Sequence, residues 1–159
     1  MEVLAIIPAR GGSKGIPKKN IQKVNGVSLL EYTVRAAKKS KKITRLIIST
    51  DSPEIAKLAT RLNVEVPFLR PMKFAKSSSP TIDFLNHALG FLKKKENYCP
   101  DIIIMLQVTS PLRNYSSIDK SVQLLIKHKA SSVLGVSEIR QHPLLAFSLS
   151  EEKNLKPNQ

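Results

Sequence analysis

A basic, glycine-rich segment near the N-terminus holds the residues best suited to chemistry. Residues 8–20 read PARGGSKGIPKKN and combine three glycines with one arginine and three lysines. Glycines let a backbone approach a ligand and turn its N–H groups towards it, and the cations would neutralise phosphate oxygens. The spacing fits neither the Walker phosphate loop nor the dinucleotide fingerprint. We therefore expect a polyphosphate-binding loop of another type, and the alternative is a basic turn that binds nothing.

Two further segments carry polar residues where predicted strands end. Arg70 ends one strand, and the hydroxyl residues of the segment SSSPT at 77–81 follow it. Gln107 ends the apolar run at 102–106 and needs a hydrogen-bond partner, which could be a bound sugar or a neighbouring backbone group. In open α/β sheets ligands bind beyond the carboxyl ends of the strands. The three segments are therefore expected to border one site.

Short apolar runs alternate with amphipathic segments along the chain. The runs are typical of buried strands in a parallel sheet and lie at 3–9, 45–50, 65–69, 102–107 and 132–136. Start signals, such as serine followed by proline, predict helices at 29–39, at 54–62, after Pro80 and from Ser116. This alternation implies right-handed crossovers, so we predict an α/β fold with a mostly parallel sheet and helices on both faces. Residues 1–159 are predicted to form a single domain.

Composition and charge exclude several classes of protein. The 159 residues include 26 Lys+Arg and 12 Asp+Glu, which gives a formal net charge of +14. Aromatic residues make up 5% and are not interleaved with the basic ones, and no recognition-helix pattern is present, so we expect no nucleic-acid partner. No apolar run is long enough to span a membrane, and residues 1–8 lack a signal-peptide pattern. A single cysteine, Cys99, fits a reducing compartment, so we expect a cytoplasmic protein without a membrane partner.

The remaining chemistry-bearing residues have ordinary structural interpretations. The three histidines and Cys99 show no metal-ligand spacing, and we expect none of them to be catalytic. Asp51 ends the second predicted strand, where a helix cap and a binding role are equally reasonable. Asp119 is predicted to cap a helix.

The opening motif IIPARGGSKGIPKKNI resembles the signature of the CMP-N-acylneuraminate synthetases, also called acylneuraminate cytidylyltransferases. The resemblance extends over essentially the whole chain through LIISTDSPEIAKLA (46–59), LRP (69–71), SPTIDFLNHAL (79–89), LQVTSPLR (106–113) and HPLLAF (142–147). It implies a Rossmann-like nucleotidyltransferase sheet. It also implies transfer of CMP from CTP to a nine-carbon α-keto sugar acid, sialic acid or a bacterial analogue, with release of pyrophosphate and a requirement for Mg²⁺.

The resemblance assigns roles to the matching positions. Arg10 and Lys19 would grip the triphosphate as the catalytic cations. Other CTP contacts would come from Gly11, Gly12, Ser13, Lys14, Asn20, Arg70 and Thr81, with Asn20 at the ribose or base and Arg70 and Thr81 at the cytosine. Gln107 would contact the acceptor sugar. In-line phosphoryl transfer gains mainly from positioning and from neutralising developing charge, which suits such cations.

The sequence departs from the family in two places. Ser77, beside Lys76, stands where many relatives have an aspartate. Family chains also continue further, into a paired-aspartate metal site, more sugar contacts and a dimerisation element. We therefore expect this chain to supply no metal ligand, with Mg²⁺ carried on the nucleotide's phosphates. Homodimerisation stays open, because the element that mediates it in the family is expected to be missing.

Two alternatives remain beside a CMP-sialic acid synthetase. The first is a non-catalytic CTP-binding or regulatory fragment, since the acidic pair is expected to be absent. The second is a cytidylyltransferase for another sugar acid, such as Kdo. Measuring which sugar acid supports pyrophosphate release would distinguish a CMP-sialic acid synthetase from a cytidylyltransferase for another sugar acid.

Overall fold

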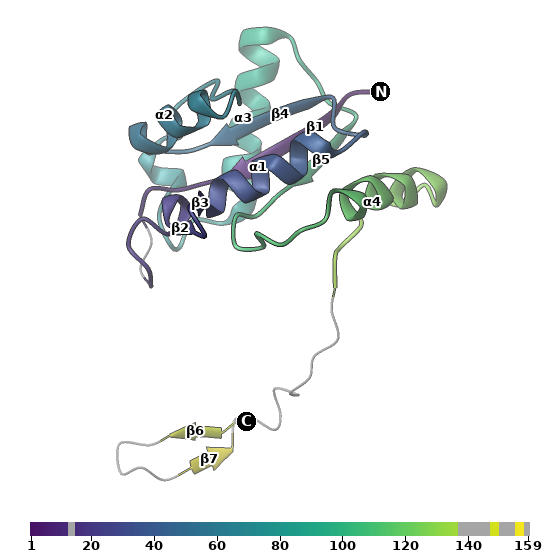
Figure 1. Ribbon diagram of the computed structural model, residues 1–159. Coiled ribbons are helices and arrows are strands. Elements are labelled where there is room, and N and C mark those ends of the chain that lie inside the picture. Colours follow the sequence, from purple (N-terminus) through teal and green to yellow (C-terminus); the bar gives the residue numbers. More distant parts are fainter. Residues whose placement is uncertain (13–14, 137–146, 150–154, 158–159) are drawn as a thin grey trace.

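A parallel three-stranded sheet forms the centre of the computed structural model, which describes residues 1–12, 15–136, 147–149 and 155–157 (Figure 1). The strand order is β4-β1-β5, with β1 at Val3–Pro8, β4 at Arg45–Ser49 and β5 at Ile102–Met105. Leu4 lies opposite Arg45 on one side of β1, and Val3 lies opposite Ile102 on the other. The predicted parallel α/β sheet is therefore confirmed.

Four helices connect or follow these strands. They are α1 at Leu29–Lys39, α2 at Pro53–Arg61, α3 at Thr81–Glu96 and α4 at Tyr115–Lys127. Three of them begin at a side-chain cap: Ser28 accepts from the amide of Glu31, Ser52 from that of Ile55, and Asn114 from that of Ser116. The predicted start of α4 at Ser116 is one residue late, because Asn114 is the capping residue.

The two faces of the sheet support separate apolar cores. Ala5 and Ile7 of β1 point to the face covered by α1, α2 and α4. Leu4 and Ile6 point to the opposite face, where α3 packs through Phe84, Ala88 and Leu92. This alternation of successive side chains is the period-2 geometry of a strand buried on both faces. Helices therefore cover both faces, as predicted, and β1 is the most completely buried element.

Short elements complete the described residues. The hairpin of β2 (Lys23–Val24) and β3 (Val27–Ser28) turns at Asn25 and Gly26, which have φ values of 51° and 77°. Two 3₁₀ turns, η1 at Lys19–Ile21 and η2 at Met72–Phe74, lie in the segments that follow β1 and residue 70. A second hairpin pairs β6 (Phe147–Leu149) with β7 (Leu155–Pro157). None of the described helices is long and apolar enough to cross a membrane.

Two predicted strands are wrong in extent. Residues 65–69 make only isolated parallel bridges, Ile47 with Glu65 and Thr50 with Leu69. Pro67 lies between these bridges and has no N–H to donate, which limits regular pairing. Residues 132–136 form no strand, and Leu134 and Val136 are 82% and 91% exposed.

The buried face of α3 departs at one position, Ile82, from what its apolar spacing predicts. Spacing places Ile82, Leu85, Leu89 and Leu92 on one apolar face, but Ile82 is 57% exposed. Leu92 is buried, and Leu85 and Leu89 pack against the core as this spacing predicts, while Phe84 and Ala88 complete the buried face.

Candidate functional site

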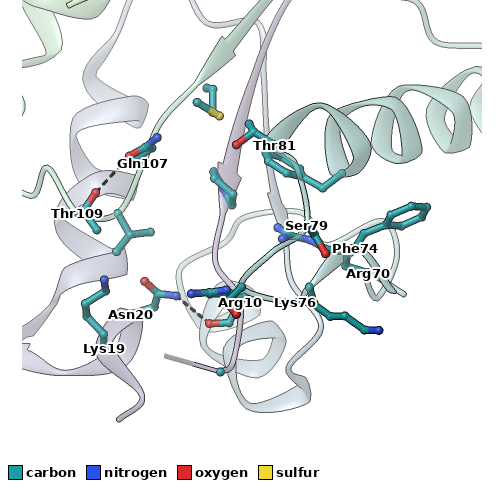
Figure 2. Close-up of a pocket in the computed structure, with 17 residues that line it drawn as sticks. Arg10, Lys19, Asn20, Arg70, Phe74, Lys76, Ser79, Thr81, Gln107 and Thr109 are labelled. Carbon is teal, nitrogen blue, oxygen red and sulfur yellow. Dashed lines mark hydrogen bonds between the residues drawn. The ribbon is translucent and has the colours of Figure 1, made fainter. Parts of the chain in front are cut away.

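A cavity of about 350 Å³ opens at the carboxyl ends of the strands (Figure 2). It is lined by Pro8, Arg10, Gly12, Lys19, Asn20, Arg70, Phe74, Ala75, Lys76, Ser77, Ser79, Thr81, Phe84, Met105, Gln107, Val108 and Thr109. The segments that follow β1, residue 69 and β5 contribute to the wall, whereas the residues that directly follow β4 do not line it. The fold thus brings together residues that are as much as 100 positions apart.

The loop that follows β1 is fixed at both of its ends. At its start, the amide of Gly11 donates to Oδ1 of Asp51 at 2.9 Å. At its end, Nδ2 of Asn20 donates to the carbonyl oxygen of Arg10 at 2.9 Å, and Asn20 is buried. Lys18 adopts φ 52° where the chain turns into η1. Two hydrogen bonds therefore hold the ends of the loop, and both involve the peptide group between Arg10 and Gly11.

The cationic side chains of this loop differ in their partners. Lys18 is exposed and pairs with Glu54 of α2 at 2.8 Å. Arg10 and Lys19 line the cavity instead, and among the described residues neither has a carboxylate within ion-pair distance. Figure 2 shows both of them at the end of the pocket where the loop closes. Their charges are available to an anionic ligand.

Arg70 is a buried member of the cavity wall, with 6% of its surface exposed. Its Nε donates to Oγ of Ser49 at 3.0 Å, and its Nη2 donates to the Ser49 carbonyl oxygen. The guanidinium also lies over the ring of Phe84, 4.6 Å from the ring centroid. Burial lowers the pKa of Arg70 to about 10; the carboxylate of Asp51 opposes this shift and the charge of Arg10 adds to it. Arg70 remains a cation at neutral pH, held in one position.

Residues 71–81 form the wall beside Arg70. The hydroxyl of Ser79 donates to the carbonyl oxygen of Lys73 at 2.9 Å, which holds this segment in a compact turn. Thr81 is exposed at the first position of α3, where no side chain caps the helix. A free hydroxyl at a helix N-terminus can accept or donate a hydrogen bond to a ligand.

His87 of α3 supports this wall from behind. The centroid of its ring lies 4.8 Å from that of the Phe68 ring and 5.4 Å from that of the Phe74 ring, and Phe74 lines the cavity. Burial lowers the pKa of His87, and the charges of Arg70 and Lys73 lower it further. A neutral imidazole therefore packs against Phe74 at neutral pH.

Gln107 lies across the pocket from Ser79 and Phe74 (Figure 2). Its side chain is exposed, and its Oε1 accepts from the hydroxyl of Thr109 at 3.3 Å. Nη2 of Arg113 donates to the Gln107 carbonyl oxygen at 3.2 Å, which ties the segment into a turn. Burial lowers the pKa of Arg113. The partner of the Gln107 side chain in this structure is thus the side-chain hydroxyl of Thr109, which is neither the bound sugar nor the backbone group expected from the sequence.

The cavity contains most of the predicted binding residues. Arg10, Gly12, Lys19, Asn20, Arg70, Thr81 and Gln107 all line it. Gly11 adjoins it, with its amide already bonded to Asp51. Ser13 and Lys14 lie outside the described residues.

Sequence reasoning missed several residues of the site. Phe74 and Thr109 line the wall. Thr109 lies inside the LQVTSPLR motif, which could have indicated it, whereas nothing in the spacing marks Phe74. Asp51 was assigned two equal roles and instead holds the loop. Asp119, predicted as a cap of its own helix, binds the segment after α1, where its carboxylate accepts from the Ser40 hydroxyl.

No carboxylate lines the cavity among the described residues. In the same part of the chain, no three His, Cys, Asp or Glu side chains gather in a group that could hold a metal ion. The arrangement as described can bind an anion through cations and amides, and it offers a metal no dedicated set of ligands.

Comparison with known proteins places the chain in a family. The sequence model described as "Cytidylyltransferase" matches residues 4–153. The chain is 35% identical to post-translational flagellin modification protein B of Campylobacter coli, over 98% of this chain and 65% of that protein. It is 34% identical to CMP-N,N'-diacetyllegionaminic acid synthase of Legionella pneumophila, over 98% of this chain and 66% of that one. It is 30% identical to N-acylneuraminate cytidylyltransferase of Streptococcus agalactiae, over 96% of this chain and 36% of the relative.

Solved structures agree with this assignment at the level of the fold. CMP:2-keto-3-deoxy-manno-octonic acid synthetase, in complex with CTP, superposes with a TM-score of 0.69 and 18% identity, over 82% of this chain and 49% of that one. A cytidylyltransferase from Leptospira borgpetersenii superposes with a TM-score of 0.61 and 23% identity, over 81% of this chain and 50% of that one. The chain spans just under two thirds of the length of the first two curated relatives and about half of these two structures. Its motifs, its matched residues and its sheet all agree: the chain belongs to the cytidylyltransferase family, as the resemblance in its sequence predicts.

Proposed function

We propose that the chain binds CTP and transfers CMP to a nine-carbon α-keto sugar acid, either sialic acid or a bacterial analogue. The anomeric hydroxyl oxygen would form a bond to the α-phosphorus as the bond from that phosphorus to the bridging oxygen breaks. Pyrophosphate would leave and the hydroxyl proton would be lost. The observation that carries the proposal is that Arg10 and Lys19 line one cavity together with Arg70 and Gln107, and that neither of the first two pairs with a carboxylate of the described residues.

The triphosphate site would be the closed loop after β1. Two cations at a cavity wall, Arg10 and Lys19, attract a polyanion, and charge-assisted hydrogen bonds to phosphate are the stronger kind. The same cations would stabilise the charge that develops on the leaving pyrophosphate. Because the loop is fastened at Gly11 and at Asn20, little reorganisation would be needed to bind the phosphates.

The base site would lie between Arg70 and Thr81. Arg70 is held by Ser49 and Phe84, so its guanidinium is a rigid donor for a carbonyl oxygen such as that of cytosine. The Thr81 hydroxyl can complement it. Asn20, which spends Nδ2 on the loop, retains Oδ1 for the ribose or the base. Gln107, on the other side of the cavity, would face the sugar acid.

Magnesium would be held by the phosphates of the nucleotide, because the described lining offers it no carboxylate. Bound in this way, Mg²⁺ supplies charge neutralisation on the leaving group. A cytoplasmic location is part of the same proposal, and it is supported by a single, unpaired and exposed cysteine, Cys99.

The same lining favours a second candidate, a CTP-binding protein without turnover. A cavity whose described lining has cations and no carboxylate can hold a nucleotide, while an acidic group that binds a metal or positions the acceptor would have to come from elsewhere. This candidate predicts selective CTP binding and no pyrophosphate release with any sugar acid.

The first experiment is calorimetric titration with CTP in the presence of magnesium, with ATP, GTP and UTP as controls. We expect selective CTP binding that is weakened roughly 100-fold in Arg10→Ala and retained in Arg35→Ala, since Arg35 pairs with Glu31 on the surface of α1. Equal, weak binding of all four nucleotides would contradict the proposal. Pyrophosphate release is then measured with N-acetylneuraminic acid, with diacetyllegionaminic and pseudaminic acids, and with Kdo. Release with a nine-carbon acid supports the enzyme, whereas none with any acid selects the second candidate.

A further inference from the structure

We propose that Asp51 is a positioning residue, which holds the phosphate-binding loop in its binding shape through the amide of Gly11. The inference rests on the proposed function, because it concerns the loop that would bind the triphosphate. Asp51 touches no ligand in this scheme and acts through residues 10–12.

The contact between Asp51 and the loop is direct and close. Oδ1 of Asp51 accepts from the Gly11 amide at 2.9 Å. A Cβ atom at position 11 would lie 2.9 Å from Cβ of Ser52, so only glycine lets the loop rest on the turn after β4. Forty residues separate the two segments in sequence, and the contact therefore fixes the loop from outside.

The turn that carries Asp51 is itself well held. The amide of Ser52 donates to Oγ1 of Thr50 at 3.1 Å, and Oγ of Ser52 accepts from the amide of Ile55 at the start of α2. Since Ser52 is the cap of α2, the helix does not need the carboxylate of Asp51 for that purpose. The side chain of Asp51 is thus left for the loop, and the capping role considered from the sequence is filled by its neighbour.

The bond from Gly11 to Asp51 is one of two hydrogen bonds that hold the peptide group between Arg10 and Gly11. On one side the Gly11 amide is held by Asp51, and on the other the Arg10 carbonyl oxygen accepts from Nδ2 of Asn20 at 2.9 Å. Both bonds hold the same peptide group, the one between Arg10 and Gly11, from its two edges, and this orients the backbone that carries the Arg10 side chain at the cavity that it lines. Gly12 follows immediately and also lines the cavity. Releasing Gly11 would let both residues move away from a bound phosphate.

Asp51 also bears a charge that acts on Arg70, and this effect can be separated from the loop contact. Its carboxylate favours the charged form of the buried Arg70 guanidinium. Asp51→Asn removes the charge and keeps an oxygen that can accept from Gly11. Asp51→Ala removes both. Loss of the hydrogen bond to Gly11 should therefore lower the affinity for CTP, and loss of the Asp51 charge should lower the thermal stability.

The test combines calorimetry with hydrogen exchange at the Gly11 amide. We expect Asp51→Ala to weaken CTP binding roughly tenfold, the size of one charge-assisted hydrogen bond, and to accelerate exchange at Gly11. Asp51→Asn should bind CTP within about threefold of the wild type and keep the protection, which a purely structural role for the charge would not produce. Glu54→Gln is the matched control, since Glu54 is an exposed acid three residues away that pairs with Lys18.

Several outcomes would overturn the inference. An Asn variant that binds CTP as weakly as the Ala variant would show that the charge acts and the acceptor does not. Unchanged affinity and unchanged Gly11 exchange in Asp51→Ala would show that the contact holds nothing. If Asp51→Ala does not fold, the Asn variant decides alone, and a tenfold loss of affinity there contradicts the proposal. If the wild type binds no CTP, the proposed function fails, while exchange at Gly11 and binding of inorganic tripolyphosphate in the same variants still test the fastening.

Discussion

The two ends of the sheet treat arginine in opposite ways. At the amino end, Arg45 pairs with Glu65 and Glu96, at 2.5 and 2.7 Å, and its guanidinium lies 4.7 Å from the ring centroid of Tyr98. At the carboxyl end, Arg10 lines a cavity and has no carboxylate partner among the described residues. The charge of Arg45 is neutralised by the protein itself, whereas the charge of Arg10 is available to a ligand.

Arg70 lies between these extremes. It is at the carboxyl end, yet it is buried and its nearest acceptors are both on Ser49, a hydroxyl and a carbonyl oxygen. Neutral acceptors orient the guanidinium without cancelling its charge. Position and availability are therefore combined in this one residue, which is what a rigid recognition group requires.

The largest expected effect comes from replacing each of the two arginines, Arg10 and Arg45, by alanine. Arg10→Ala should weaken CTP binding roughly 100-fold, because more than one charge-assisted contact to phosphate is lost, and should leave the Tm unchanged. Arg45→Ala should leave CTP affinity unchanged and lower the Tm by about 5 °C, as expected for roughly 1–2 kcal/mol in a domain of this size. Calorimetry and thermal unfolding measure the two arms. Equal loss of CTP affinity in both variants would break the comparison.

Neighbouring lysines offer the same contrast within one loop. Lys19→Ala should weaken CTP binding about tenfold, since Lys19 lines the cavity and pairs with no acid in the described part of the chain. Lys18→Ala should change it less than about twofold, because that ammonium already pairs with Glu54 on the surface. Titration at low and high salt checks both. An equal effect of the two substitutions would mean that the loop attracts phosphate through its summed charge alone.

Two adjacent glycines sharpen the steric part of the comparison. Gly11→Ala should lower the free energy of unfolding by about 1–3 kcal/mol, because its methyl group would overlap Ser52. Gly12→Ala should be nearly neutral, since a Cβ there meets nothing within 4 Å. Urea unfolding of the pair measures the difference. Equal stability would contradict the close approach of loop and turn.

The smallest expected effect is a pH dependence at the amino end. The Ser40 hydroxyl donates to Asp119, as do the amides of Lys41 and Lys42, and these bonds lower the pKa of its carboxyl group. The stability that Asp119 contributes is therefore present above pH of about 4, the ordinary pKa of Asp, and is lost as the pH falls through the lowered value. Asp119→Asn should flatten the acid limb of the Tm profile and leave CTP affinity unchanged. A wild-type acid limb that the substitution leaves unaltered would remove Asp119 from this role.

Much of the fold could be predicted because local signals and burial agree. α1 begins and ends where the sequence predicts, since a capping serine, an apolar face and terminal lysines all point to Leu29–Lys39. The hairpin at 23–28 was missed, although Asn25-Gly26 is a recognised turn signal, because two-residue strands have no period to detect. Residues 132–136 failed for the opposite reason, since β propensity alone does not supply a neighbouring strand.

Many residues that line the candidate cavity could be predicted from the sequence, whereas the contacts between them could not. Arg10, Lys19 and Arg70 could be selected from residue type and from the family resemblance. The bond from Gly11 to Asp51 and the burial of Arg70 against Phe84 depend on contacts between distant segments, which spacing does not encode. The sequence therefore indicates which residues are candidates for binding, and the structure shows which of their side chains are available to a ligand.

The position of β1 at the centre of the sheet has a consequence for how the chain acquires its structure. β1 is made first, but its two partners begin at residues 45 and 102. During synthesis an apolar strand must wait for about a hundred residues before both of its edges are paired, and closing such long loops is slow. An unpaired, wholly apolar strand is also what chaperones and aggregating chains recognise. We therefore expect the timing of translation around β5 to govern the yield of folded protein more strongly than any single contact in the finished sheet.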